Sequence, residues 1–254
     1  MASPVKIGIL GAAGRMGYAL RAEINKHEKA ELVAALVAVG SGVLGTDAGG
    51  VKFTSDVRAA LGVCDVLIDF SHPKAAIDAA LMMYETPCRT LVTGTTGYSA
   101  TEEKALEQAA STITLVKSGN FSIGICVLES LVTKAAAALP KANLLENWDS
   151  GILDIHHNQK IDAPSGTALM LGRALEAGGQ SIDPSEIVSL RHGGVVGEHS
   201  VFLSSNMETI TLTHTAIDRA VFAKGALTAA LWAAERGAAE QNTGLYNMRD
   251  VLGL

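Results

Sequence analysis

Short apolar runs alternate with longer stretches of helical periodicity over the first half of the chain. Runs rich in Val, Ile and Leu predict strands, and stretches with apolar residues every three or four positions predict helices. Strands that alternate with helices predict a parallel, doubly wound, Rossmann-like α/β sheet, whose ligands bind at the carboxyl ends of the strands. The predicted strands are 5–10, 31–39, 65–70, 89–93 and 113–117, and the predicted helices are 18–26, 73–83 and 100–110.

The pattern changes after a long predicted helix at 123–139. Strands now follow one another with few helices between them, which predicts a mostly antiparallel or mixed sheet in a second, α+β domain. A last helix at 218–236 is expected to return to the first domain, and 246–254 is a short apolar tail. We therefore expect one domain of residues 1–122 and 220–254 and a second of 123–219. The strand-like runs are 143–148, 152–156, 187–191, 200–204 and 209–214.

A glycine-rich turn follows the first predicted strand. Gly11, Gly14 and Gly17 have the spacing G-x-x-G-x-x-G and lie between a strand and a helix, the context of a dinucleotide fingerprint. Gly11 permits the tight turn, Gly14 lets a pyrophosphate approach the backbone, and Gly17 lets the helix pack on the strand. A tight turn that binds nothing is the alternative.

The end of the second predicted strand does not identify the nucleotide. An acidic side chain is expected there for NAD, but the positions hold Val37 and Ala38. No Lys or Arg lies between Lys29 and Lys52, so a cation for a 2′-phosphate is missing as well. Phe70-Ser71-His72 and T-G-T-T-G at 93–97 end two further strands, so we expect them at the cofactor edge.

Candidate chemistry is concentrated in residues 154–169, D-I-H-H-N-Q-K-I-D-A-P-S-G-T-A-L. Pro164 and Ser165 precede an Ala- and Leu-rich run that predicts a helix start, and such a start suits a bound carboxylate or phosphate. Lys160 adds a positive charge, and His156 or His157 can donate a proton near neutral pH. A strand, a turn and an ordinary capped helix with merely polar histidines is the alternative.

Composition sets the outer limits of the interpretation. The chain has 254 residues, 48% of them hydrophobic, and a formal net charge of −6 without a long basic run, which disfavours nucleic-acid binding. Cys64, Cys88 and Cys126 are odd in number and widely spaced, so neither a disulfide framework nor a zinc site is predicted. Without an evident leader or membrane-spanning run, we expect a cytoplasmic protein.

A cofactor edge in one half and a proton donor beside a cation in the other predict reduction of a small anionic substrate by NADH or NADPH in an interdomain cleft. Metal-dependent hydrolysis is disfavoured, and no metal is predicted, because the histidines lack a ligand spacing such as H-E-x-x-H. Adjacent histidines on a strand also point to opposite faces. Another two-domain NAD(P)-dependent oxidoreductase and a non-catalytic NAD(P)-binding sensor remain alternatives.

Motifs along nearly the whole chain point to one family. The most diagnostic is H-H-N-Q-K-I-D-A-P-S-G-T-A at 156–168, and the final helix region supports it. The supporting motifs are G-A-A-G-R-M-G at 11–17, D-F-S-H-P at 69–73, T-G-T-T-G at 93–97, N-F-S-I-G at 120–124 and G-E-H at 197–199. With these motifs the chain resembles the 4-hydroxy-tetrahydrodipicolinate reductase (dihydrodipicolinate reductase) family of bacterial lysine and diaminopimelate biosynthesis.

The resemblance implies a Rossmann domain and an α+β domain that binds substrate and forms a homotetramer. It implies the reduction of a cyclic imine-type dicarboxylate to tetrahydrodipicolinate with NADH or NADPH. His156 would be the general acid and Lys160 the essential cation, while His157, Gly166 and Thr167 would bind the substrate carboxylates. Implied cofactor contacts are Gly11, Arg15 and Met16 at the pyrophosphate, Phe70 and His72 near the adenine, and Gly94, Thr96 and Phe121 near the nicotinamide.

The chain departs from the family pattern at the nucleotide end. Members commonly carry a glutamate, often followed by arginine, where this chain has Val37-Ala38. His72 stands where an arginine is also seen. We therefore expect loose discrimination between NADH and NADPH.

Overall fold

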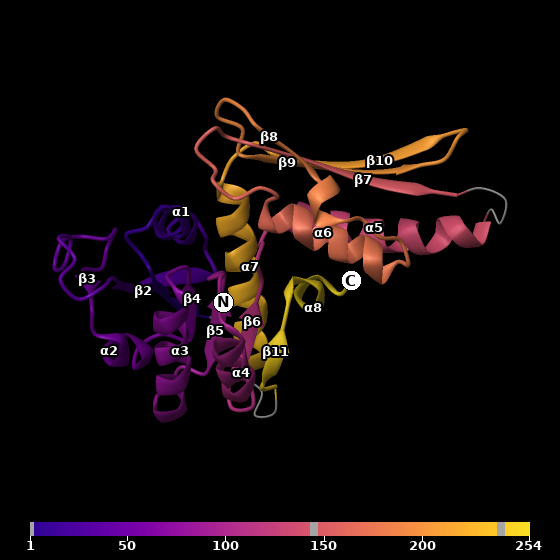
Figure 1. Ribbon diagram of the computed structural model, residues 1–254. Helices are drawn as coiled ribbons and strands as arrows, with labels where there is room; N and C mark the ends of the chain where they lie inside the picture. Colours follow the sequence, from indigo (N-terminus) through magenta and orange to yellow (C-terminus); the bar gives the residue numbers. More distant parts are fainter. Residues whose placement is uncertain (1–2, 143–146, 238–241) are drawn as a thin grey trace. The chain divides into compact units, whose positions relative to one another are not determined.

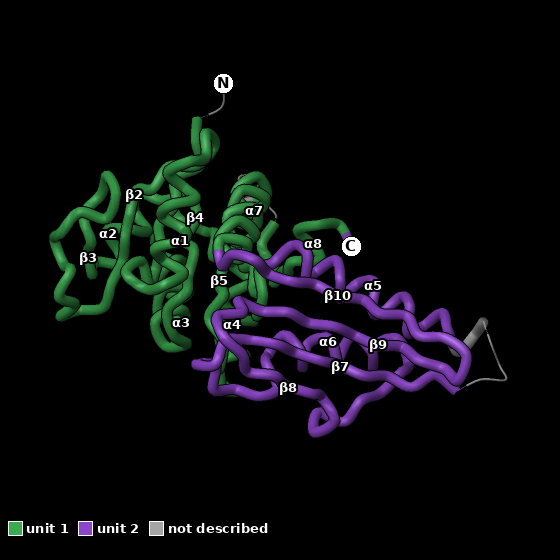
Figure 2. Tube along the Cα trace, turned by 90° about the horizontal axis from the view of Figure 1, so that it is seen from above, with its two compact units in different colours: residues 1–121, 220–253 green, residues 122–219, 254 purple. Residues whose placement is uncertain are grey.

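The computed structural model describes residues 3–142, 147–237 and 242–254. Contacts divide the chain into two compact units, coloured green and purple in Figure 2. Unit 1 comprises Met1–Phe121 and Ala220–Gly253, and unit 2 comprises Ser122–Arg219 with Leu254.

Unit 1 is built on a seven-stranded sheet in which, among the described residues, every paired strand is parallel to its neighbours (Figure 1). The strand order is β11-β6-β5-β4-β1-β2-β3. The Rossmann-like sheet predicted from the sequence is thereby confirmed. The strands are β1 (Val5–Leu10), β2 (Ala30–Leu36), β3 (Phe53–Thr54), β4 (Val66–Asp69), β5 (Thr90–Thr93), β6 (Thr114–Lys117) and β11 (Gly244–Tyr246).

Helices cover both faces of this sheet. A core cluster contains Leu67, Leu91 and Leu115, which are in register on adjacent strands, together with Ala79 of α3 and Leu106 of α4. The long helix α7 packs on β4, β5 and β6 and against α1. The helices are α1 (Arg15–Ile24), α2 (Val57–Leu61), α3 (Pro73–Met82), α4 (Ala100–Ala109), α7 (Ala220–Gly237), α8 (Met248–Leu252) and the 3-10 helix η1 (Met83–Glu85).

The sequence prediction differs from the structure mainly at short elements. Helix α1 begins three residues earlier than the predicted 18–26, and β2 ends at Leu36 instead of residue 39. The predicted apolar tail contains the last residue of β11 and the whole of α8. Elements such as β3 and β11 are two or three residues long, so they carry almost no periodic signal, and pairing with a neighbouring strand defines them.

Unit 2 contains a four-stranded mixed sheet with the order β10-β9-β7-β8, which confirms the predicted α+β class. Strands β7 and β8 are parallel, and β9 is antiparallel to both β7 and β10. Residues 143–146 of the predicted strand 143–148 lie outside the described residues, and β7 begins at Asp149. The strands are β7 (Asp149–His156), β8 (Val188–Arg191), β9 (Gly197–Ser204) and β10 (Thr209–Ala216).

One face of the unit 2 sheet is packed and the other is open. Ile152 of β7 and Val201 of β9 are in register and belong to a buried cluster with Leu128 of α5 (Ile123–Ala142) and Leu171 of α6 (Gly166–Ala177). Side chains alternate along a strand, so Asp154 and His156 point to the same packed face as Ile152. The sheet therefore carries two ionisable side chains into its buried side.

Candidate active site

The start of helix α6 is fixed by Ser165. Its side chain is the N-cap and accepts a hydrogen bond from the amide of Ala168 at 3.1 Å. Gly166 is the exposed first residue of the helix, and no atom of the described residues outside its immediate neighbours lies within 4 Å of the position where its Cβ would be. The Gly166 backbone is therefore open to a ligand at a helix end that favours negative charge.

A buried carboxylate holds this helix start in place. Asp154 is fully buried, accepts the amide of Ser165 at 2.6 Å and pairs with the guanidinium of Arg191 at 2.7 Å. Burial alone would raise the pKa of Asp154, but the hydrogen bonds from Arg191 and Ser165 outweigh it and hold the pKa well below its usual range. Asp154 is therefore ionised, and it joins β7, β8 and α6.

Arg191 extends this network to the segment that carries Lys160. The second terminal nitrogen of Arg191 donates to the backbone carbonyl of Asp162 at 2.6 Å. The ammonium of Lys160 pairs with the Asp162 carboxylate at 2.8 Å, and the Lys160 side chain is 22% exposed against 57% for Asp162. The contact with Lys160 lowers the pKa of Asp162 against the opposing effect of its partial burial. The half-buried ammonium of Lys160 is thus paired with the exposed carboxylate of Asp162.

His156 ends β7 and is 8% exposed, and its ring makes an edge-to-face contact with the ring of His199 at a centroid distance of 5.0 Å. Burial lowers the pKa of His156 to about 4, and the nearby charge of Lys160 adds to the effect. Burial likewise lowers the pKa of His199 to about 4, with His156 contributing. Both rings are therefore neutral at pH 7 when no ligand is present.

Asp154, His156 and His199 offer ligand atoms that lie within 4.8 Å of one another, so the described part of the chain holds a trio with the spacing of a metal site. Sequence reasoning missed this trio because His199 lies on β9, far from the other two residues. The carboxylate of Asp154, however, is already bound to Arg191 and to a backbone amide. Because a bound cation would face that guanidinium, we interpret the trio as a polar network.

The remaining predicted substrate residues lie beside this cluster. His157 follows the last residue of β7 and is half-buried. Thr167 is half-buried in the first turn of α6. The contacts from His156 through His199 to Ser165 bring the end of β7 and the start of α6 together. The structure therefore gathers a ring nitrogen, an ammonium and a helix start in unit 2.

The glycine turn of unit 1 has the geometry that the sequence predicted. Gly11 has φ +85°, and a Cβ there would lie 2.5 Å from the carbonyl oxygen of Phe70. A Cβ on Gly17 would lie 2.4 Å from the Gly11 carbonyl oxygen, so only glycine lets α1 approach the turn this closely. The backbone of Gly11 also donates to Leu36 at the end of β2.

This turn borders a cavity of about 480 Å³ at the carboxyl ends of the strands. Seven of the nine predicted cofactor residues line it, and Ser71, Pro73 and Thr95 line it as well. Gly11 lies behind the lining against Phe70, and Phe121 is buried with its ring 5.7 Å from the Phe70 ring, centroid to centroid. The seven lining residues are Gly14, Arg15, Met16, Phe70, His72, Gly94 and Thr96.

Two features hold the residues that line this cavity in place. A Cβ on Gly94 would lie 2.2 Å from the Phe70 ring, so glycine is required for the ring to sit there. Buried Asp69 accepts hydrogen bonds from the Ser71 amide and from the Thr93 hydroxyl. Burial raises the pKa of Asp69 although these bonds oppose it. Asp69 joins the loops after β4 and β5, a link that sequence reasoning missed.

Arg21 supports the loop that follows β2. Arg21 of α1 donates to the Ala48 carbonyl at 2.8 Å and to the Ala12 carbonyl at 3.2 Å, and it lies over the Phe53 ring at 5.1 Å. It therefore fastens the 40–50 loop to the glycine turn. Val37 is buried and Ala38 is exposed at the neighbouring strand end.

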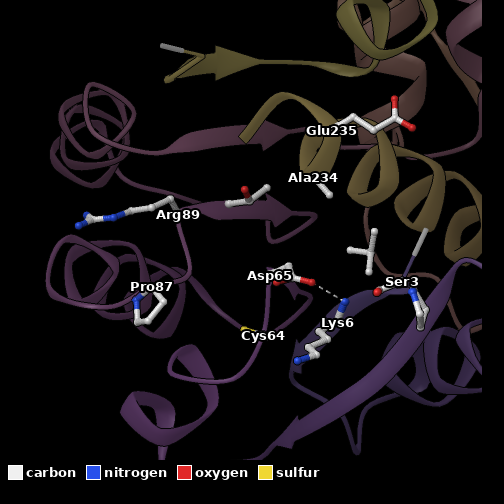
Figure 3. A pocket seen from close by; sticks show the side chains of 11 residues that line it. Ser3, Lys6, Cys64, Asp65, Pro87, Arg89, Ala234 and Glu235 are labelled. Carbon is white, nitrogen blue, oxygen red and sulfur yellow. Dashed lines mark hydrogen bonds between the residues drawn. The ribbon is translucent and has the colours of Figure 1, made fainter. Parts of the chain in front are cut away.

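A second cavity of unit 1, about 550 Å³, lies at the opposite ends of the strands (Figure 3). Lys6 of β1 lines it, as do Asp65 and Arg89, which immediately precede β4 and β5. The backbone amide of Lys6 donates to the Asp65 carboxylate at 2.8 Å, drawn as a dashed line in Figure 3. Ligands of doubly wound sheets bind at the carboxyl ends, so this cavity lies on the wrong edge for a dinucleotide.

Comparison with known proteins identifies the protein family. Residues 5–121 match the family model for the N-terminus of dihydrodipicolinate reductase, and residues 124–252 match the model for its C-terminus. The chain belongs to the dihydrodipicolinate reductase family. The 4-hydroxy-tetrahydrodipicolinate reductase of Allorhizobium ampelinum is 40% identical, with 98% of each chain covered. That of Parvibaculum lavamentivorans is 38% identical, with 100% of each chain covered.

Solved structures agree with this family fold. Dihydrodipicolinate reductase from Paenisporosarcina sp. TG-14, solved with bound dipicolinate, has a TM-score of 0.75 at 21% identity and covers 96% of this chain and 97% of its own. Among the described residues, no helix is both long and apolar enough to cross a membrane.

The two buried imidazoles make stability depend on pH. Their pKa values of about 4 lie below the ordinary value of 6.5, so between pH 6.5 and 4 the unfolded chain binds more protons than the folded one. The contribution of these two neutral rings to the free energy of unfolding is therefore fully present above pH 6.5 and is lost as the pH drops toward 4. We expect urea denaturation to show this loss, on the order of 1 kcal/mol or more for each ring.

The variant His199→Phe provides the matched test of this prediction, because its ring cannot titrate. We expect a shallower dependence of unfolding free energy on pH between 7 and 4.5 in His199→Phe than in wild type. Equal slopes in the two proteins would contradict neutral burial of His199.

Proposed function

We propose that the protein is an NAD(P)H-dependent 4-hydroxy-tetrahydrodipicolinate reductase of lysine and diaminopimelate biosynthesis. The reduced nicotinamide supplies a hydride to a cyclic imine dicarboxylate, and the protein supplies a proton and positive charge. The observation that carries this proposal is the cluster of side chains in unit 2, where His156, Lys160 and the open start of α6 lie together around the buried Asp154 network. Relatives in the same family bear the name 4-hydroxy-tetrahydrodipicolinate reductase. Each part of the cluster suits one need of a dianionic substrate.

His156 is proposed as the general acid. Its ring is neutral without ligand because of burial and neighbouring positive charge. A substrate dianion reverses that balance, since an opposite charge nearby favours the protonated imidazole. Binding the substrate therefore loads the proton that the reduction consumes.

Lys160 is proposed as the cation that holds a substrate carboxylate, with the amides at Gly166 and Thr167 and the ring of His157 as further contacts. The partner of Lys160 in the structure is Asp162, whose side chain is 57% exposed. An exposed pair of this kind is worth about 0–1 kcal/mol, so a substrate carboxylate displaces Asp162 at little cost.

The nicotinamide cofactor is proposed to bind at the glycine turn. Gly11, Gly14, Arg15 and Met16 would contact its pyrophosphate. The aromatic and loop residues Phe70, His72, Gly94, Thr96 and Phe121 would contact its adenine and nicotinamide ends. The cavity at the carboxyl ends of the strands supports this assignment, since seven of these nine residues line it.

Substitutions in unit 2 separate the two proposed roles. Lys160→Ala is expected to raise KM for the diacid and lower kcat, because the anion loses its counter-charge in both states. His156→Asn is expected to lower kcat by about 10²–10⁴-fold with a smaller change in KM, because it removes a general acid. Both are measured by following NADH oxidation with substrate made by the preceding synthase.

Lys104→Ala is the control for these assays, since it removes a lysine from α4 of unit 1 and leaves the unit 2 cluster intact. It is expected to keep wild-type kcat and KM. Near-normal activity of both Lys160→Ala and His156→Asn would refute the site assignment.

The residues that follow β2 support weak discrimination between NADH and NADPH. Val37 and Ala38 offer no carboxylate for a ribose hydroxyl or against a 2′-phosphate. Arg21 is already bonded to two carbonyl groups. We expect the ratio of kcat/KM for the two cofactors to stay below about a hundredfold, or about 2.7 kcal/mol. A larger ratio in steady-state assays would contradict weak discrimination between the two cofactors.

A homotetramer formed through the open face of the unit 2 sheet is also proposed. Val188 and Leu190 of β8 are 61% and 47% exposed, and their register partners Leu153 and Ile155 of β7 lie on the same face. Such an apolar patch on β7 and β8 suits contact with a second copy of the chain.

Light scattering after gel filtration is expected to give a mass four times the 26.3 kDa of the chain. Leu190→Glu is expected to reduce that mass, because it places a charge in the proposed interface. Val63→Glu, a charge at an exposed apolar position of unit 1, is expected to leave it unchanged. A monomeric wild type, or an unaffected Leu190→Glu variant, would argue against assembly through this face.

A further inference from the structure

The proposed acid is not oriented by a hydrogen bond. Among the described residues no hydrogen bond reaches the ring of His156, and its Nδ1 is buried without a partner. On the other side, the Nε2 atom faces Gly197, where an added Cβ would lie 3.1 Å away. A side chain that must deliver a proton in a fixed direction needs some other support.

That support is the ring of His199. It lies across the ring of His156 at 5.0 Å between centroids and an interplanar angle of 72°. His199 is 4% exposed and stands opposite Asp154 in the register of β9 and β7, so its own position is set by the sheet. An edge-to-face contact of this kind fixes the tilt of both rings.

A hydrogen bond anchors His199 to the helix that is proposed to bind the carboxylates. Its Nε2 lies 3.1 Å from the Ser165 hydroxyl. That hydroxyl also accepts the amide of Ala168, and it has a proton to donate and a second lone pair to accept with, so it can bond Nε2 in either tautomer of His199. The same serine is the N-cap of α6. His199 therefore connects the acid to the anion-binding helix start.

We propose that His199 is a positioning residue for the reduction: anchored to the Ser165 N-cap, it sets the orientation of the His156 ring relative to the carboxylate-binding start of α6. This inference rests on the proposed function of the site. His199 itself does not transfer the proton, because its Nε2 is bonded to Ser165 and no hydrogen bond joins the two rings.

Two substitutions at position 199 separate the ring contact from the anchor. His199→Gln places an amide where Nε2 lies and retains a bond to Ser165, but it removes the ring. His199→Phe keeps a ring against His156 and loses the bond. We expect kcat to decrease in the order wild type, His199→Phe, His199→Gln, with at least a tenfold loss in the last, a fraction of what a general acid contributes.

The KM for the diacid is expected to stay within threefold in both variants, because Lys160 and the α6 amides are untouched. Misdirected proton delivery also has an isotopic signature. The solvent deuterium isotope effect on kcat is expected to be larger in His199→Gln than in wild type, and the effect of 4-deuterated NADH smaller, since proton transfer then limits the rate more.

His214→Gln is the control for general damage to the sheet. His214 lies opposite His199 on β10, and its Nε2 is 3.2 Å from the hydroxyl of Ser122, which directly precedes α5. This variant removes a comparable imidazole contact without touching His156, so its isotope effects are expected to match wild type.

A folded His199→Gln protein with kcat within twofold of wild type would overturn the inference, as would a tenfold loss with an unchanged solvent isotope effect. A wild-type protein that does not reduce the diacid would instead refute the proposed function itself. The two failures are therefore distinguishable.

Discussion

The buried ion pair between Asp154 and Arg191 is the interaction on which the unit 2 site depends. One carboxylate accepts both the Arg191 guanidinium and the amide of Ser165, so strands β7 and β8 and the start of α6 meet at a single group. Removing one partner of a buried pair typically costs about 3–5 kcal/mol, because the other charge is left uncompensated. The pair therefore holds the Ser165 N-cap, and with it the start of α6, against β7 and β8.

The same network explains why the proposed acid is placed beside so much charge and yet stays neutral. His156 is buried next to Lys160 and Arg191, and burial and both positive charges oppose its protonation. Asp154 acts in the opposite direction, but its charge is already neutralised by Arg191. Without a ligand the proton affinity of His156 is therefore low, and an anion placed beside the ring would raise it.

The local pattern of apolar and polar residues predicted the longer helices and strands. The contacts that it did not predict join residues far apart in the sequence. The strand, glycine turn and helix at 5–26 are specified within one stretch of sequence, so both their order and the geometry of the turn followed from it. The pair Asp154–Arg191 joins residues 37 positions apart, and no spacing rule connects them. One signal was available: alternation along β7 places Asp154 and His156 on the face of Ile152, where a charged residue needs a partner.

The two cations of the site differ in one respect that decides their roles. Arg191 is paired with a carboxylate that is 0% exposed, whereas Lys160 is paired with one that is 57% exposed. A ligand that competed for Arg191 would have to leave Asp154 buried and unpaired, at a cost of several kcal/mol. A ligand that competes for Lys160 only returns Asp162 to water, which costs at most about 1 kcal/mol. Lys160 is therefore the cation that can exchange its partner for another anion at low cost, and Arg191 is the one that cannot.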